Sequence, residues 1–155
     1  MSAPNCVQLS PNQNNQFAED QDPCISSLTS TGSVLAATKL CGEVALFQLE
    51  NVLSSSSSSS NDISPFATFR AHKDSLNSSK FLSSKAAGGN NGALLVTCSD
   101  DSSVRIFDCK NINDGNRGYP IGLYPAPSEV NCLCESTDGT LLYAGCEDGS
   151  VVTYT

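Results

Sequence analysis

The sequence contains a single histidine, His72, and an aspartate, Asp101, that could pair with it as an acid–base couple. The chain is also rich in serine, the residue type that such a couple would activate as a nucleophile. No G-x-S-x-G motif or other oxyanion-forming glycine motif accompanies these residues. We therefore predict that the chain is not an enzyme and has no catalytic residues.

Eight cysteines offer a second kind of chemistry, because Cys132 and Cys134 lie two positions apart and Cys146 follows. Zinc sites favour C-x2-4-C pairs combined with a second pair or with histidines, and His72 is far away in the sequence. We predict no metal site and no cofactor. Nothing directs the chain to an oxidising compartment, so the cysteines are interpreted as mostly reduced, small and buried. They are Cys6, Cys24, Cys41, Cys98, Cys109, Cys132, Cys134 and Cys146.

The charge pattern limits the partners of the chain. Sixteen acidic and eight basic side chains give a net charge of -8, and the basic side chains are scattered. Direct nucleic-acid binding is not expected, because it requires a basic surface. Residues 1–22 are polar without an apolar core, and no segment is long enough to span a membrane. We expect a soluble, non-secreted chain with neither a membrane nor a small-molecule substrate as partner.

Three segments repeat one pattern, in which an apolar strand, a tight turn and a second strand ending in an aromatic residue follow one another. The turn residue and the aromatic residue keep the same spacing in all three copies. Two antiparallel strands around a short turn explain each copy. The segments are VLAATKLCGEVALF (34–47), LLVTCSDDSSVRIF (94–107) and LLYAGCEDGSVVTY (141–154).

Additional apolar segments flank these hairpins and complete a four-strand unit. We expect an all-β fold with two full units and three strands of a third. The segments lie at 24–28, 76–82 and 130–134 before the hairpins, and at 66–69 and 121–124 after the first two. The predicted organisation is a flexible segment 1–22, units at 23–70 and 71–125, and an incomplete unit at 126–155.

Two stretches of low apolar content lengthen the repeats, namely the serine run within 54–62 and the Gly- and Asn-rich stretch 85–92. Such segments bury too little surface to become ordered, so we interpret both as flexible loops. We expect faster amide exchange there than in the three hairpins.

The middle unit resembles the WD40 repeat of β-propeller proteins. Ala71-His72 stands where the family has Gly-His, and Phe107-Asp108 stands where it has Trp-Asp. The resemblance implies a structural tetrad of His72, Thr97, Asp101 and Phe107. Phe107 lacks the indole N–H, so we expect the hydrogen-bond chain to end at Thr97.

The first and third units depart from the family pattern. Cys41 replaces the turn aspartate of the first unit, and Ala37 and Ala144 replace the hydroxyl residue equivalent to Thr97. The third unit keeps Asp148 but has Ser128-Glu129 where Gly-His is expected. These two units are therefore expected to depend on packing more than on a tetrad.

Short strings across the chain are similar to the N-terminal blades of a WD40 subunit of the nuclear THO/TREX messenger-RNA export complex. They are VLAATKLCGEVALFQLENVLSSS, ATFRAH, SEVNCL and LLYAGCEDG. This resemblance implies a scaffold, in the nucleus and possibly also in the cytoplasm, whose blades contact other protein subunits of a THO-like assembly. RNA would be bound mainly by those neighbouring subunits. The resemblance assigns no partner-contact residue to a position of this sequence.

Two alternatives remain open. Some WD40 proteins are substrate adaptors of cullin-type ubiquitin ligases through a Trp-Asp-x-Arg motif, and Phe107-Asp108-Cys109-Lys110 is a weak version of it, because lysine lacks the planar fork of arginine. The chain could instead be a truncated isoform without independent activity, since too few units are present to close a ring. Self-association or a terminal strand from 6–9 would then be needed to cover the open ends.

Overall fold

The computed structural model describes residues 24–50, 64–83, 94–112 and 118–155. The predicted flexible segment 1–22, the candidate strand 6–9 and the predicted loops 54–62 and 85–92 lie outside these residues. Within the described residues, no helix is long and apolar enough to cross a membrane.

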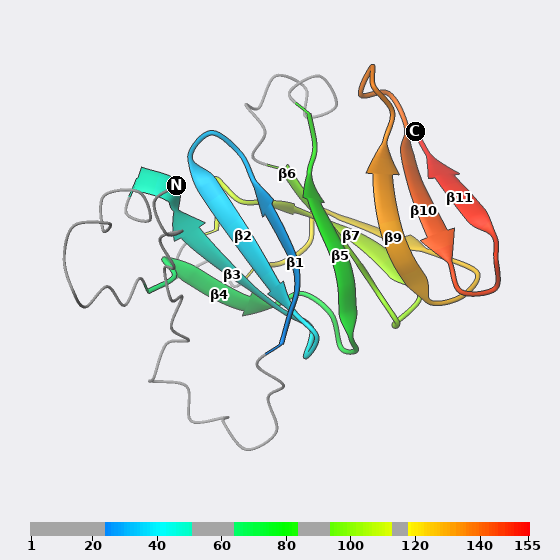
Figure 1. Ribbon diagram of the computed structural model, residues 1–155, viewed down its shortest axis with the longest axis horizontal. Helices are drawn as coiled ribbons and strands as arrows, with labels where there is room; N and C mark the ends of the chain where they lie inside the picture. Colours follow the sequence, from blue (N-terminus) through cyan, green and yellow to red (C-terminus); the bar gives the residue numbers. More distant parts are fainter. Residues whose placement is uncertain (1–23, 51–63, 84–93, 113–117) are drawn as a thin grey trace, which may run out of the picture.

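The described residues form eleven strands in three antiparallel sheets (Figure 1). Sheet 1 has the order β1 (Ile25–Ser30), β2 (Val34–Lys39), β3 (Glu43–Gln48) and β4 (Ala67–Arg70). Sheet 2 has the order β5 (Leu76–Phe81), β6 (Leu94–Ser99), β7 (Ser103–Asp108) and β8 (Gly122–Pro125). Sheet 3 contains β9 (Val130–Glu135), β10 (Leu142–Cys146) and β11 (Val151–Tyr154). The all-β prediction with two four-stranded units and one three-stranded unit is confirmed.

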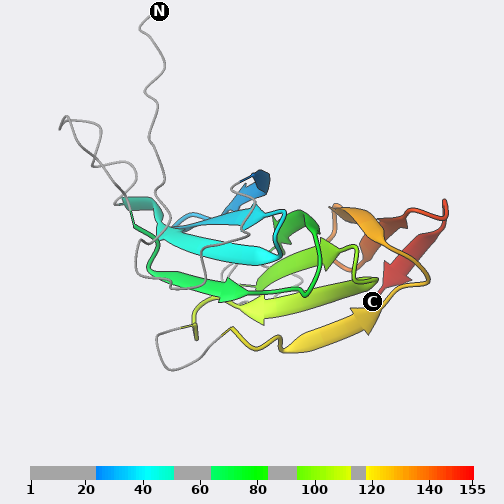
Figure 2. The same ribbon diagram turned by 90° about the horizontal axis from the view of Figure 1, so that it is seen from below.

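The first strands of the sheets, β1, β5 and β9, lie beside one another, and the later strands fan outward (Figures 1 and 2). Side chains join these strands where backbone pairing between sheets is absent. Ser79 N donates to Ser27 Oγ at 3.2 Å, and Phe81 N donates to Thr29 Oγ1 at 3.2 Å. Asn77 Nδ2 donates to the Val130 carbonyl oxygen at 3.0 Å. These bonds satisfy inner-strand backbone groups that would otherwise lack partners.

The inner part of sheet 2 is buried on both faces, because it packs against sheet 1 on one side and sheet 3 on the other. Strand β6 accordingly reads LLVTCS with five of its six residues buried. A continuous apolar strand of this kind is typical of a sheet covered on both faces. The core between sheets 1 and 2 includes Val44, Leu46, Phe69, Leu76, Leu95 and Phe107. The core between sheets 2 and 3 includes Leu82, Val96, Val104, Val130, Leu142 and Ala144.

The three hairpin turns share a residue with positive φ directly after the turn residue of the repeat. These residues are Gly42 (φ 87°), Ser102 (φ 57°) and Gly149 (φ 84°). Glycine adopts this conformation without a steric penalty, whereas serine does not. At Gly42 the loop that contains His72 and Asp74 approaches closely, which is a second reason for glycine at this position. A Cβ there would lie 2.5 Å from the His72 carbonyl oxygen and 2.8 Å from that of Asp74.

We expect Gly42→Ala to lower the free energy of unfolding by about 2 to 3 kcal/mol, since alanine would add both backbone strain and a clash. Gly149→Ala is the matched control, because a Cβ at Gly149 would meet nothing within 4 Å. Gly149→Ala should lower the free energy of unfolding clearly less than Gly42→Ala, because it adds backbone strain alone. Urea unfolding of the two variants measures the difference, and equal losses would refute the role of the close approach.

Candidate functional site

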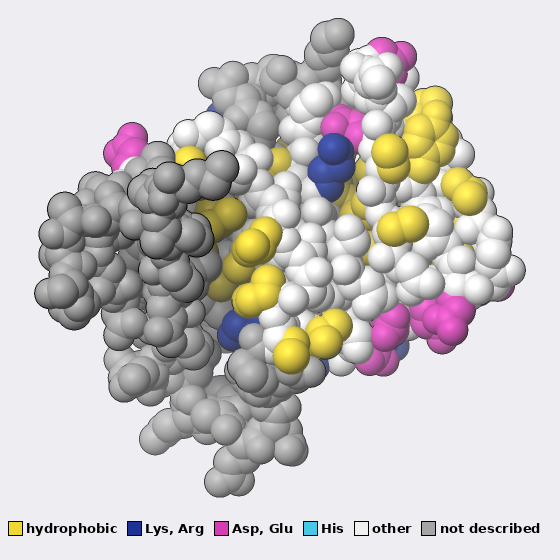
Figure 3. Space-filling view, in the orientation of Figure 1, with side chains coloured by type: hydrophobic (Ala, Val, Ile, Leu, Met, Phe, Trp, Pro, Cys, Tyr) yellow, Lys and Arg dark blue, Asp and Glu magenta, His cyan; other side chains and the backbone are white. Residues whose placement is uncertain are grey.

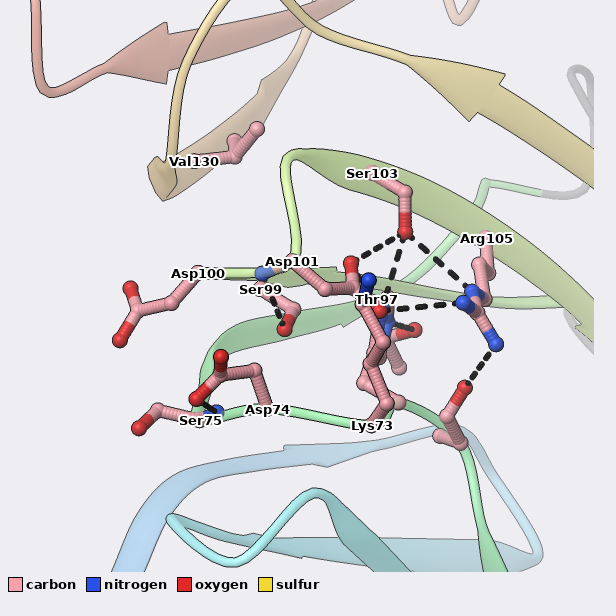
Figure 4. Close-up of polar contacts among 12 residues, drawn as sticks. Lys73, Asp74, Ser75, Thr97, Ser99, Asp100, Asp101, Ser103, Arg105 and Val130 are labelled. Atoms are coloured by element: carbon pink, nitrogen blue, oxygen red, sulfur yellow. Dashed lines mark hydrogen bonds and ion pairs between the residues drawn. The ribbon is translucent and has the colours of Figure 1, made fainter.

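His72 lies at the centre of a buried hydrogen-bonded network that joins the segment between β4 and β5 to β6 and to the β6–β7 turn. Thr97, Asp101 and Ser103 of this network are labelled in Figure 4. Its Nδ1 lies 3.1 Å from Asp101 Oδ1, and its Nε2 lies 2.8 Å from Thr97 Oγ1. His72 is only 1% exposed, and Thr97 is fully buried. The structure therefore brings together three of the four residues of the predicted tetrad through hydrogen bonds that join the segment before β5 to β6 and to the β6–β7 turn.

Phe107, the fourth predicted residue, makes no hydrogen bond through its hydrocarbon side chain and takes a packing position instead. It is fully buried, and its ring lies 5.0 Å from the ring of Phe69 with a tilt of 49° between the planes. Phe69 belongs to β4 of sheet 1. Phe107 therefore anchors the contact between sheets 1 and 2.

Two further residues, Ser103 and Arg105, complete the network and were missed by the sequence analysis. Ser103 Oγ donates to Asp101 Oδ1, and Arg105 Nη2 donates to Asp101 Oδ2 at 3.0 Å. Arg105 Nη1 also donates to the Ala71 carbonyl oxygen at 2.8 Å (Figure 4). Alternate residues of a strand share a face, so the spacing of Ser103, Arg105 and Phe107 could have indicated this arrangement.

The protonation states follow from this environment. Burial lowers the pKa of His72, although the neighbouring Asp101 carboxylate opposes the shift. Burial alone would raise the pKa of Asp101, but the hydrogen bonds from Ser103 and His72 and the charge of Arg105 hold that pKa below its ordinary value. A neutral His72 that donates from Nδ1 to an ionised Asp101 and accepts from Thr97 satisfies all three groups. Both side chains are 0% exposed, so they stabilise the fold and have no access to a substrate.

This assignment predicts a pH dependence of stability. His72 is the only histidine, and its pKa is lowered from 6.5 in the folded chain. Below pH 6.5 the unfolded chain therefore binds a proton that the folded chain does not, and stability should fall by up to about 1.4 kcal/mol per pH unit. Asp101 stays ionised over this range, because its pKa is lowered, and adds no slope.

Urea unfolding at pH 7.5, 6.5 and 5.5 measures this dependence. His72→Gln should be less stable throughout and should lose the slope between pH 6.5 and 5.5. A variant that retains the full slope would show that another group is responsible.

The equivalent positions of the other sheets are simpler. Ala37 and Ala144 occupy the strand position of Thr97, and both are buried. In sheet 3, the Asp148 side chain is exposed and accepts from Ser150 N at 2.9 Å, while Asp148 N donates to Ser128 Oγ at 3.2 Å. These two sheets therefore lack a buried His–Asp pair.

The cysteines are less buried than the sequence analysis predicted. Among the seven described cysteines, only Cys98, Cys109 and Cys146 are buried. Burial raises the pKa of Cys98 and of Cys109 to about 12. Cys132 and Cys134 are exposed, because the face of β9 on which they lie has no neighbouring sheet. Cys146 packs toward sheet 2, away from that face, and no group of three or more potential metal ligands occurs among the described residues.

Large hydrophobic side chains are exposed on several strands. Figure 3 shows hydrophobic side chains, a class that there includes cysteine, over β9–β11. Tyr119, Ile121 and Leu123 alternate along the segment that enters β8, the outermost strand of sheet 2. Pro120 lies within this row and Pro125 follows it, and both lack N–H donors, which disfavours pairing of another strand with this edge. Exposed apolar rows of this kind are typical of surfaces that contact other proteins. The exposed large hydrophobic residues among those that the structure describes are Ile25, Leu28, Phe66, Tyr119, Ile121, Leu123, Tyr124 and Val151.

Comparison with protein families identifies the class. The family model "WD domain, G-beta repeat" matches residues 63–108 and 118–154, which together cover more than half of the chain. The chain belongs to the WD40 family, and its three sheets are β-propeller blades. No curated protein matches the chain significantly. WD40 domains are generally non-catalytic scaffolds that bind other proteins, and this role agrees with the buried His72 network and the exposed apolar side chains.

Proposed function

We propose that this chain is a scaffold subunit of a THO/TREX-type assembly that acts in nuclear messenger-RNA processing and export. The observation that carries the proposal is the similarity of four strings to the N-terminal blades of THO complex subunit 6. In the structure, the first string contains β2 and β3, and ATFRAH contains β4 and His72. The last two strings contain parts of β9 and β10. The similarity thus extends over elements of blades 1 and 3 and the junction between blades 1 and 2.

The charge of the chain supports a protein partner. With a net charge of -8, the surface repels phosphate backbones, so contact with RNA would fall to other subunits. Protein subunits would instead contact exposed apolar side chains such as Ile121, Leu123 and Val151.

Affinity purification of the tagged full chain from nuclear extract, followed by mass spectrometry, tests the proposal. We expect recovery of THO subunits, and Asp101→Ala should reduce it because the variant destabilises the blades. Fluorescence of the tagged chain should be mainly nuclear. Recovery of no THO subunit by a chain that is folded by circular dichroism would overturn the proposal.

The same experiment separates the alternative role in a cullin-type ubiquitin ligase. In the Phe107-Asp108-Cys109-Lys110 motif, Phe107 and Cys109 are buried and only Lys110 is exposed. The Asp108 carboxylate accepts from Lys110 N and from Asn111 Nδ2, which fixes a local turn. A ligase adaptor bound through this motif would be lost in Lys110→Glu, whereas recovery of THO subunits should not change.

A further inference from the structure

A cavity of about 200 Å³ lies between blades 2 and 3, at the ends of β5, β7, β9 and β11. Its volume is below the range of about 300 to 1,000 Å³ that is typical of small-molecule sites, but it is large enough for one long side chain. The walls are mostly apolar or aromatic and include Leu82, Leu94, Ile106, Tyr124, Leu142 and Tyr154. The rings of Tyr124 and Tyr154 lie 5.4 Å apart.

Glu135 is the one acidic side chain that lines this cavity, and that side chain is only 8% exposed. Its two oxygens accept from Ser83 N at 2.9 and 3.3 Å, which fixes the carboxylate and leaves further acceptor sites on both oxygens. Lys80 Nζ lies 3.9 Å away on a side chain that is 40% exposed, so this ion pair is long and screened by solvent. Ser83 Oγ is buried and has no hydrogen-bond partner among the described residues, but Ser83 is not one of the residues that line the cavity.

The corresponding cavity between blades 1 and 2 provides an internal comparison. It has a similar volume of about 230 Å³ and lies at the same ends of the strands. Its apolar lining includes Val34, Phe66 and Phe81, but its one charged lining residue is Lys110. The two cavities are therefore alike in volume and in their place in the fold, whereas an acidic lining side chain is found in the cavity between blades 2 and 3.

We propose that the cavity between blades 2 and 3 binds an arginine or lysine side chain from a basic segment of a partner protein. The aliphatic stem lies against Leu82 and Leu142 and beside the two tyrosine rings, and the cationic group binds the Glu135 carboxylate. The net charge of -8 attracts a basic segment over a longer range. This inference rests on the proposed role as a protein scaffold, and it specifies the chemistry of one partner segment.

The test uses the full chain, labelled with ¹⁵N, and three peptides of the form acetyl-Gly-Gly-X-Gly-Gly-amide with X as arginine, lysine or norleucine. Norleucine keeps the aliphatic stem without the charge. Saturable shifts of the Ser83, Glu135 and Leu141 amide signals are expected with the arginine and lysine peptides. The apparent affinity of the norleucine peptide should be at least about tenfold weaker, because this peptide lacks the charged hydrogen bond.

Matched variants locate the site. Glu135→Gln keeps an acceptor for Ser83 N and should weaken binding by about tenfold, whereas Glu129→Gln removes the same charge from an exposed position and should leave binding unchanged. Leu141→Trp should fill the cavity from its partly exposed edge and block binding of all peptides. Equal binding of the norleucine peptide, or equal weakening by both glutamate variants, would overturn the proposal. Failure of all three peptides to bind would also overturn this proposal. It would not bear on the proposed function, because recovery of THO subunits is measured in a separate experiment.

Discussion

Asp101→Ala is expected to lower the free energy of unfolding by about 3 to 5 kcal/mol, the range for removing one partner of a buried charge pair. The substitution would leave the Arg105 guanidinium without its carboxylate. It would also remove the Asp101 acceptor of His72 Nδ1, leaving only Ser103 Oγ at 3.4 Å. Ser103 Oγ would lose its acceptor as well. Because the Asp101 side chain is 0% exposed, water cannot replace these bonds without opening the structure.

Asp148→Ala is the matched control, since Asp148 has the same place in the repeat of blade 3. Its side chain is exposed and accepts from Ser150 N and Ser150 Oγ. Its replacement should lower stability far less than Asp101→Ala. Asp101→Asn should be intermediate, because the amide oxygen can still accept one bond. Urea unfolding monitored by circular dichroism measures all three, and similar losses for Asp101→Ala and Asp148→Ala would refute the importance of the buried network.

Phe107→Ala is expected to cost about 3 to 5 kcal/mol, through lost burial and the cavity left between blades 1 and 2. The ring is fully buried and contacts Phe69 across the blade interface. Neighbouring strands are held by backbone pairing and cannot collapse into the space. Unlike Asp101→Ala, this variant should leave the hydrogen-bonded network intact, so the His72-dependent pH slope should persist.

Tyr154→Ala serves as the control, since Tyr154 has the repeat position of Phe107 in blade 3. It is partly exposed, packs beside Tyr124 and donates only a 3.4 Å hydrogen bond to the Pro125 carbonyl oxygen. Its loss should lower the free energy of unfolding by less than half of the Phe107→Ala effect. If thermal and urea unfolding gave the same loss for both variants, the blade 1–blade 2 interface would not be the dominant contact.

The strands could be predicted because each unit repeats a local pattern. Alternating apolar residues before and after each turn gave the hairpins, and the structure confirms them with shifts of one or two residues, as in β1 at Ile25–Ser30 instead of 24–28. Strand ends depend on pairing with a neighbour, which a single segment does not reveal. A bulge between Ile25 and Ser27 is one such effect of pairing.

The network was only partly predictable. His72, Thr97 and Asp101 were named from the repeat pattern, but Arg105 was counted only as one scattered basic residue. Its role depends on the Ala71 carbonyl oxygen, which β4 of the preceding blade positions. The exposure of Cys132 and Cys134 likewise depends on the absence of a sheet over one face of β9 among the described residues.

The sequence alone determined the class of fold and the number of strands in each unit, because these depend on periodicity and spacing within about fifty residues. The residues of the His72 pair came from the resemblance to the WD40 repeat. The tertiary structure decided which polar groups became buried together, that Glu135 lines a cavity while Lys110 lines its counterpart, and which apolar side chains remain exposed. These features arise where two blades meet, and the packing of one blade on the next brings together residues that no local pattern connects.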